Sequence, residues 1–305
     1  MSRFVRFTTF GTPSVLHIID VEPPQPGDGQ VRIQVRYAGL NPVDYKLLSG
    51  GPAAASWGVT PPSGNGNDYS GVIDAIGAGV TGLALGTPVF GGSRFFAQAD
   101  FVVAHADTVI PKPEALSFEQ AGALDIAGRA AIASVRSLHL TESDTVLVSA
   151  AAGGVGVIAA QLALRTGATV VGTASAGHHD FLRELGVIPV SYGAGLVERI
   201  RALVPEVTAA LDNNGPDTID AALELGVPGT SINTIAARGH RSELGILGIG
   251  GQGVSTTELA DLAALIARGE VVLPIDSVFP LERVVEAYER LIAGHLRGKI
   301  VLAMQ

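Results

Sequence analysis

One turn constrains the fold of this chain more than any other feature. Residues 150–161 read AAAGGVGVIAAQ and place Gly153, Gly154 and Gly156 where an apolar helix should begin. The preceding residues, 145–150 (TVLVSA), have the composition of a buried strand. A glycine-rich turn between a strand and a helix is typical of dinucleotide folds, because glycine lets a pyrophosphate approach the main chain and the helix N-terminus attracts its charge. We therefore predict a nucleotide-binding turn here.

The sequence around this turn alternates between strand and helix patterns. Alternation of this kind implies a parallel sheet covered by helices. The predicted strands are residues 145–150, 169–173, 190–192, 209–212, 231–236 and 243–249. The predicted helices are residues 117–138, which open with a capping box at Ser117 and Gln120, and then 155–166, 180–185, 196–203 and 258–268.

The first 120 residues have a different texture, rich in strands and turns. Residues 31–37 alternate apolar and polar side chains, and residues 69–76 and 101–103 are further strand candidates. The segment 49–66 is rich in glycine and proline and predicts a long loop. Near the C-terminus we expect a helix over 284–293 and a strand over 299–303.

Composition excludes several classes of function. The 305 residues are 47% hydrophobic and 16% charged, which suits two domains with a large core. Cysteine is absent, so disulfides, thiolate catalysis and cysteine-ligated zinc are excluded. A net charge of −9 without a basic cluster argues against nucleic acid and anionic membranes as partners. We also expect no membrane-spanning helix and no signal peptide, and hence a cytoplasmic protein.

The end of the second predicted strand favours NADP over NAD. An NAD enzyme places a carboxylate there to hold the ribose 2′-hydroxyl, whereas this chain has Ser175. A serine leaves room for a 2′-phosphate and can donate a hydrogen bond to it. His178, His179, Arg183 and Tyr192 are further candidate donors, with ordinary polar loop residues as the alternative.

Several segments together resemble one family, the zinc-independent quinone oxidoreductases (zeta-crystallin-like) of the medium-chain dehydrogenase/reductase superfamily. AAAGGVG is similar to the family's nucleotide turn, GLNPVDYKLLSG to its G-x-N-P-x-D stretch, and GNDYSGVIDAIG to its G-x-D-x-x-G-x-V segment. The opening residues, TASAGHHDFLRELG and GHLRGKIVL are similar to further family segments.

The resemblance implies an α/β fold with two domains. Residues 1–120 with 268–305 would form a GroES-like β-rich catalytic domain, and residues 121–267 a Rossmann domain with a doubly wound parallel sheet. The active site would lie between them, and a homodimer would form through the edge strand at 243–249. Carried over by position, the cofactor NADP would contact Asn41, Ala150, Gly153, Gly154, Val155, Gly156, Ser175, Tyr192 and, in place of a missing basic residue, His178 or His179.

The implied chemistry is hydride transfer without a metal. GNDYSG lacks the His-Glu pair of the zinc-dependent relatives, so we expect no metal site and an electron-poor acceptor, a quinone or an α,β-unsaturated carbonyl. Asn41 inherits a place beside the nicotinamide and substrate. Tyr45 or Lys46 could donate a hydrogen bond or a proton to the product enolate, with solvent as the alternative donor.

Two segments depart from the family pattern. The family's nicotinamide-proximal threonine is Ala130 here, and the charges of Asp125 and Arg129 are additional. These two form a local ion pair, or else Arg129 faces the cleft and recruits a polar acceptor. The stretch DNNG at 212–215 is also more polar than in the family. These changes keep two alternatives open: a biosynthetic tailoring enzyme of the same fold, and an NADPH-binding sensor or structural protein without turnover.

Overall fold

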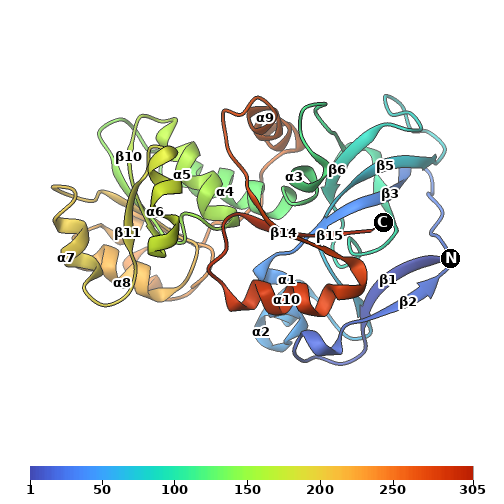
Figure 1. Ribbon diagram of the computed structural model, residues 1–305, viewed down its shortest axis with the longest axis horizontal. Helices are drawn as coiled ribbons and strands as arrows, with labels where there is room; N and C mark the ends of the chain where they lie inside the picture. The colour runs from blue at the N-terminus through green and yellow to red at the C-terminus, as the bar shows by residue number, and fades with distance from the viewer. Residues whose placement is uncertain (305) are drawn as a thin grey trace.

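The computed structural model describes residues 1–304 and has the predicted α/β architecture of two lobes. One lobe holds a five-stranded sheet, and the other holds a seven-stranded and a three-stranded sheet. The chain starts and ends in the second lobe, and its central part builds the first (Figure 1). Both termini therefore belong to the lobe that the sequence predicted to be β-rich.

The five-stranded sheet is entirely parallel, with strand order β11-β10-β9-β12-β13. The order reverses between β9 and β12, so the loops after these two strands diverge and leave a crevice at their carboxyl ends. Its strands are β9 (Thr145–Val148), β10 (Thr169–Ala174), β11 (Ile188–Ser191), β12 (Ala209–Asp212) and β13 (Ile232–Thr234). The helices between them are α5 (Gly154–Leu164), α6 (His179–Glu184), α7 (Leu196–Arg201) and α8 (Pro216–Glu224).

The β-rich lobe is closed by the C-terminal strands. Strand β15 pairs antiparallel with β3, and β14 pairs parallel with β15. Its strands are β1 (Ser2–Phe7), β2 (His17–Val21), β3 (Gln30–Gly39), β4 (Ser63–Gly64), β5 (Asp68–Ile76), β6 (Pro88–Gly92), β7 (Phe101–His105), β8 (Ile110–Pro111), β14 (Ile275–Pro280) and β15 (Lys299–Ala303). The remaining helices are α1 (Pro42–Leu48), α2 (Gly51–Trp57), α3 (Phe118–Gly122), α4 (Asp125–Ser137), α9 (Thr256–Ala267) and α10 (Val284–Ala293).

The sequence predictions for residues 243–249 and 49–66 were wrong. Residues 243–249 form no strand: they contain a 3-10 turn over Ser242–Leu244 and a single bridge from Leu247 to Asn233. Glycines at every second or third position, including Gly245 at φ +80°, prevent a regular strand there. The segment 49–66 is also no simple loop, because its alanines build α2, which ends at a left-handed Gly58.

The predicted helix over 117–138 is broken in two, and the break matters for the site. Ser117 accepts a hydrogen bond from the Gln120 N–H, so the predicted capping box is confirmed. Helix α3 ends at Gly122 with Ala123 as its C-cap, and α4 begins at Asp125. The first N–H groups of α4 have no partner within the helix. That of Ile126 donates instead to the buried carboxylate of Asp68, at 3.0 Å.

One hydrophobic core spans the two lobes. Buried side chains of the parallel sheet, such as Val148, belong to the same cluster as Leu124 of the α3–α4 break and Phe90 and Ile110 of the β-rich lobe. Close-packed protein interiors resist deformation. We therefore expect the side of the crevice that this shared core forms to be rigid.

Candidate active site

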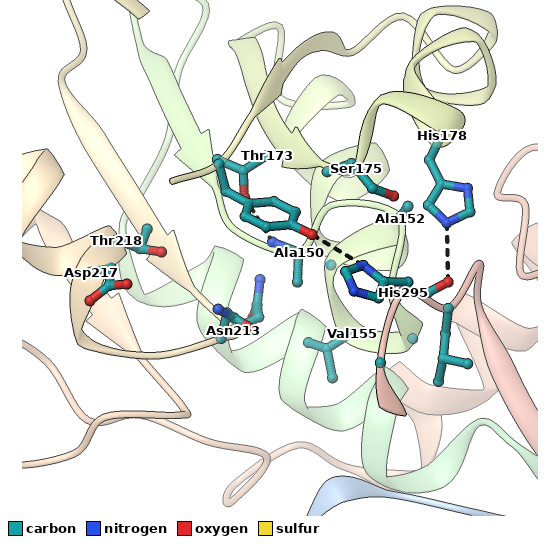
Figure 2. Close-up of a pocket in the computed structure, with 18 of the residues that line it drawn as sticks. Ala150, Ala152, Val155, Thr173, Ser175, His178, Asn213, Asp217, Thr218 and His295 are labelled. Atoms are coloured by element: carbon teal, nitrogen blue, oxygen red, sulfur yellow. Dashed lines mark hydrogen bonds between the residues drawn. The ribbon is translucent and has the colours of Figure 1, made fainter. Parts of the chain in front are cut away.

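A cavity of about 960 Å³ lies between the lobes, at the carboxyl ends of the parallel strands. The turn after β9, the ends of β10 and β12, helix α1 and the segment before β15 contribute to its wall. Figure 2 shows Ala150, Ser175 and Asn213, which follow three neighbouring strands, converging on it. The crevice expected from the strand order is therefore present as a cavity.

The glycine turn serves both packing and ligand access. A Cβ on Gly156 would lie 2.1 Å from the carbonyl oxygen of Ala150, and one on Gly154 would lie 2.5 Å from Cδ of Lys299. Both glycines are thus required by neighbouring protein atoms. The N-cap, Gly153, gives α5 no side-chain cap, so the first N–H groups of the helix open onto the cavity. These unsatisfied donors fit the pyrophosphate of a dinucleotide.

Two histidines, His178 and His295, line the same end of the cavity as Ser175. The sequence candidates Ser175, His178 and Tyr192 lie in its wall, and the structure adds His295. The Tyr192 hydroxyl lies 3.1 Å from Nδ1 of His295, and Nε2 of His178 lies 3.3 Å from the His295 carbonyl oxygen (Figure 2). His295 follows α10, 103 residues from Tyr192 in the chain. Sequence analysis missed it because only the fold brings these residues together.

Two weaker candidates for this end do not line the cavity. His179 instead places Nε2 3.4 Å from the Ser191 hydroxyl, and Arg183 forms an ion pair with Asp180 at 2.6 Å. His179 opens α6 and Arg183 lies in its last turn, and neither side chain is among those that line the cavity. Of the two histidines, the structure therefore brings His178, and not His179, to the proposed 2′-phosphate position.

The opposite end of the cavity holds a buried polar network around Asn41. The Asn41 amide donates from Nδ2 to Asp68 Oδ2 at 3.0 Å, and its Oδ1 accepts from Nζ of Lys299 at 2.5 Å. The same ammonium donates to the Leu40 carbonyl at 2.7 Å and lies 3.8 Å from Asp68 Oδ2. Asp44 accepts from the Asn41 N–H at 2.8 Å. Asn41 thus lies in the cavity wall with its amide held in place.

Burial shapes the charges of this network. Burial raises the pKa of Asp68 to about 7, assisted by the charges of Asp125 and Asp44 and opposed by that of Lys299. Burial likewise raises the pKa of Asp44 to about 6. The pKa of Lys299 is lowered by burial, against the attraction of both carboxylates. The network therefore holds fewer charges near neutral pH than its composition suggests.

Tyr45 and Lys46, neighbours on α1, have different surroundings. Tyr45 is partly buried in the cavity wall, and burial raises the pKa of its phenol, so that the group stays protonated at neutral pH. Lys46 is exposed and does not line the cavity. The helix turns about 100° per residue, which sends consecutive side chains in different directions. The structure therefore brings only Tyr45 to the site.

Arg129 does not face the cavity either. Its Nε donates to Asp125 Oδ1 at 2.8 Å, four residues earlier on α4, and its Nη1 donates to the Val254 carbonyl at 2.5 Å. This is the local ion pair that the sequence left as the alternative. Ala130 is buried, and it is Ala127, one turn earlier, that reaches the cavity wall. The two extra charges of α4 thus secure the helix.

Comparison with known proteins places this site in a family. Residues 27–114 match the alcohol dehydrogenase GroES-like domain model, and residues 185–302 match the zinc-binding dehydrogenase model. A mouse quinone oxidoreductase is 30% identical over 338 residues, with 100% of this chain and 98% of the relative covered. The chain belongs to the quinone oxidoreductase family.

Solved structures of quinone oxidoreductases share the whole fold. The enzyme from Coxiella burnetii superposes with a TM-score of 0.90 at 32% identity, covering 100% of this chain and 99% of the other. The Escherichia coli quinone oxidoreductase complexed with NADPH gives a TM-score of 0.85 at 25% identity, covering 99% and 100%. In this quinone oxidoreductase family member, residues 1–304 contain no group of three or more histidines, aspartates or glutamates placed to hold a metal.

Proposed function

We propose that the protein is an NADPH-dependent reductase that transfers a hydride to a quinone or an α,β-unsaturated carbonyl. The observation that carries this proposal is the cavity itself: an uncapped helix N-terminus at one wall, a fixed amide at Asn41, and a serine where NAD enzymes place an acid. The family relationship supports the same reaction class, since the Escherichia coli relative is complexed with NADPH.

The residues fit a dinucleotide along the length of the cavity. The N–H groups of α5 beyond Gly153 supply donors for the pyrophosphate. Ser175, His178, Tyr192 and His295 gather where the adenosine 2′-phosphate would lie. When bound, the reduced nicotinamide supplies the hydride. Because acceptors of this kind are already electron-poor, the protein needs mainly to position them and to stabilise the developing oxyanion.

Asn41 and Tyr45 are the polar groups that we assign to the acceptor. Asn41 is held by two buried partners, so its amide can stabilise a developing oxyanion without moving. The Tyr45 phenol lies in the same wall and stays protonated at neutral pH, so it can supply the proton that completes the reduction. Lys46 and Arg129, the other sequence candidates, have no place at the cavity from which to act.

The experiment that tests the function is a coenzyme and acceptor comparison. Purified protein should oxidise NADPH faster than NADH with 1,4-benzoquinone or but-3-en-2-one, followed at the absorbance of the reduced nicotinamide. NADPH binding without turnover on both acceptors would favour the sensor alternative. A preference for NADH would overturn the role given to Ser175 and the histidines.

The assembly of the protein is part of the same proposal. We propose that residues 1–120 with 268–305, and residues 121–267, act as the two domains that enclose the coenzyme, and that two copies form a cytoplasmic homodimer. Support for the dimer comes from β13 at the sheet edge, beside the exposed side chains of Leu244 and Ile249. Within residues 1–304, no helix is both long and apolar enough to cross a bilayer. Light scattering of the purified protein tests the dimer.

A further inference from the structure

Lys299 is a buried cation that joins the coenzyme turn to the acceptor end of the cavity. It opens β15, and only 5% of its side chain is exposed. Its methylene stem fills the space that a side chain on Gly154 would need. The preceding residue, Gly298, donates from its N–H to the Ala152 carbonyl at 2.8 Å. The start of β15 is thus anchored on the turn, and from there the ammonium reaches Asn41.

The Asn41 amide is fixed from both ends, and the chemistry of its partners decides its orientation. An ammonium group can only donate, so the atom facing Lys299 must be the amide oxygen. The nitrogen then faces Asp68, 3.0 Å away. Nδ2 carries two hydrogens, and the hydrogen bonds within residues 1–304 supply an acceptor for one of them. Because Asn41 lines the cavity, the second hydrogen is left for a ligand.

We propose that Lys299 is the positioning residue of this centre: with Asp68 it fixes the Asn41 amide so that its second Nδ2 hydrogen is donated to the carbonyl oxygen of the acceptor. This inference rests on the proposed function for its substrate. An ammonium bonded to Oδ1 also polarises the amide and strengthens its N–H as a donor. Lys299 therefore acts on the reaction through Asn41, without touching the acceptor.

The charged groups that surround Asn41 and Lys299 determine the effect of removing Lys299. Asp44 faces Asn41 and also accepts from the Tyr288 hydroxyl at 3.1 Å, while Asp125 is already paired with Arg129. Burial raises the pKa of the Tyr69 hydroxyl, and the nearby charge of Asp125 raises it further. Lys299 is consequently the cation that offsets Asp68 and Asp44. Removing it should raise the pH at which these two carboxyls ionise.

The decisive experiment is a double-mutant cycle between Lys299 and Asn41. Lys299→Met should lower kcat with 1,4-benzoquinone on the order of 100-fold, the loss typical of a misplaced catalytic group, while the Kd of NADPH changes less than about threefold. In an Asn41→Ala background the same substitution should cost nothing further, because its effect passes through the amide. Equal losses in both backgrounds, or an unchanged kcat, would overturn the proposal.

A second variant and a control guard against loss of folding. Asp68→Leu removes the acceptor at the other end of the amide. It should lower kcat in the same way as Lys299→Met, and it should cause no further loss in the Asn41→Ala background. Lys112→Met is the matched control, because Lys112 also donates to backbone carbonyls, those of Pro113 and Leu116 among them, but lies outside the cavity. Its kcat should not change. A loss of kcat there equal to that of Lys299→Met would mark the effect as general destabilisation and contradict the proposal.

A measurement without turnover separates this inference from the proposed function. In protein labelled with ¹⁵N-asparagine, the Asn41 side-chain amide is the resonance that disappears in Asn41→Ala. Its hydrogen exchange should be slow in the unaltered protein and at least tenfold faster in Lys299→Met. Should the protein reduce neither test acceptor, the proposed function fails while slow exchange still supports the positioning. Equal exchange in both proteins would refute the positioning even in an active enzyme.

Discussion

The two ends of the cavity are built in different ways. At the acceptor end, Asn41, Asp68 and Lys299 are almost completely buried and bonded to one another. At the adenosine end, Tyr192 is 50% exposed, and its bond to His295 lies at the surface. Buried polar networks are costly to disturb, whereas exposed hydrogen bonds contribute little each. The comparison teaches that the polar groups we assign to the acceptor are fixed by the core, while those we assign to coenzyme preference are exposed groups that can be replaced singly.

The largest effect should come from the acceptor end. Asn41→Ala removes the donor that we assign to the developing oxyanion, and kcat with 1,4-benzoquinone should fall on the order of 100-fold. NADPH affinity, measured by fluorescence titration, should change far less. If Asn41→Ala instead weakened NADPH binding and left kcat intact, the amide would belong to coenzyme binding and the contrast between the ends would disappear.

Two glycine substitutions compare the ends directly. Gly156→Ala places a Cβ 2.1 Å from the Ala150 carbonyl oxygen, and this overpacking should lower the free energy of unfolding by about 1–3 kcal/mol in urea. Gly177→Ala meets no atom within 4 Å and should be nearly neutral. Equal destabilisation by both substitutions would show that the adenosine end is as tightly packed as the turn.

The pH dependence of stability should report the buried acids. The pKa of Asp68 is raised to about 7 in the folded state, against about 3.9 for an unfolded aspartate. The proton is held more tightly by the folded protein, so this stabilisation is full below pH 4 and is lost as the pH rises through about 7. Urea unfolding between pH 5 and pH 8 should therefore show a decline of about 2–3 kcal/mol that is smaller in Asp68→Asn. An identical decline in both proteins would contradict the raised pKa.

A single surface substitution should change coenzyme preference. Ser175→Asp introduces a carboxylate that repels a 2′-phosphate and can hold a 2′-hydroxyl, so NADPH should bind about tenfold more weakly and NADH more tightly. Ser56→Asp makes the same charge change on exposed α2 and controls for net charge. Unchanged affinity for both coenzymes in Ser175→Asp would place the 2′-phosphate elsewhere.

The smallest effect should come from His295. His295→Ala removes a partner of Tyr192 at the surface, and NADPH affinity should fall about threefold while NADH affinity stays the same. His139→Ala is matched for backbone strain, since both histidines have positive φ, 53° and 48°. An equal loss of affinity for NADH would show that His295 supports the packing of the two lobes and does not contact the 2′-phosphate.

The sequence by itself determined the nucleotide turn and the parallel sheet around it. These are local signals: glycines after a buried strand, and an apolar run of helix length, carry their meaning in about a dozen residues. The end of the second predicted strand and the resemblance named Ser175, His178 and Tyr192 as candidate coenzyme contacts, and all three line the cavity. Asn41 and Tyr45 came from the resemblance, and they too line the cavity.

Only the tertiary structure decided which polar residues act together. Lys299 and Asn41 are 258 residues apart, and His295 and Tyr192 are 103 apart. No local pattern marks such pairs, because they meet only when β15 returns to β3 and anchors on the turn after β9. The sequence also left open whether Arg129 faces the cleft or pairs with Asp125. The direction of its side chain decides this, and that direction is set by helix packing rather than by sequence spacing.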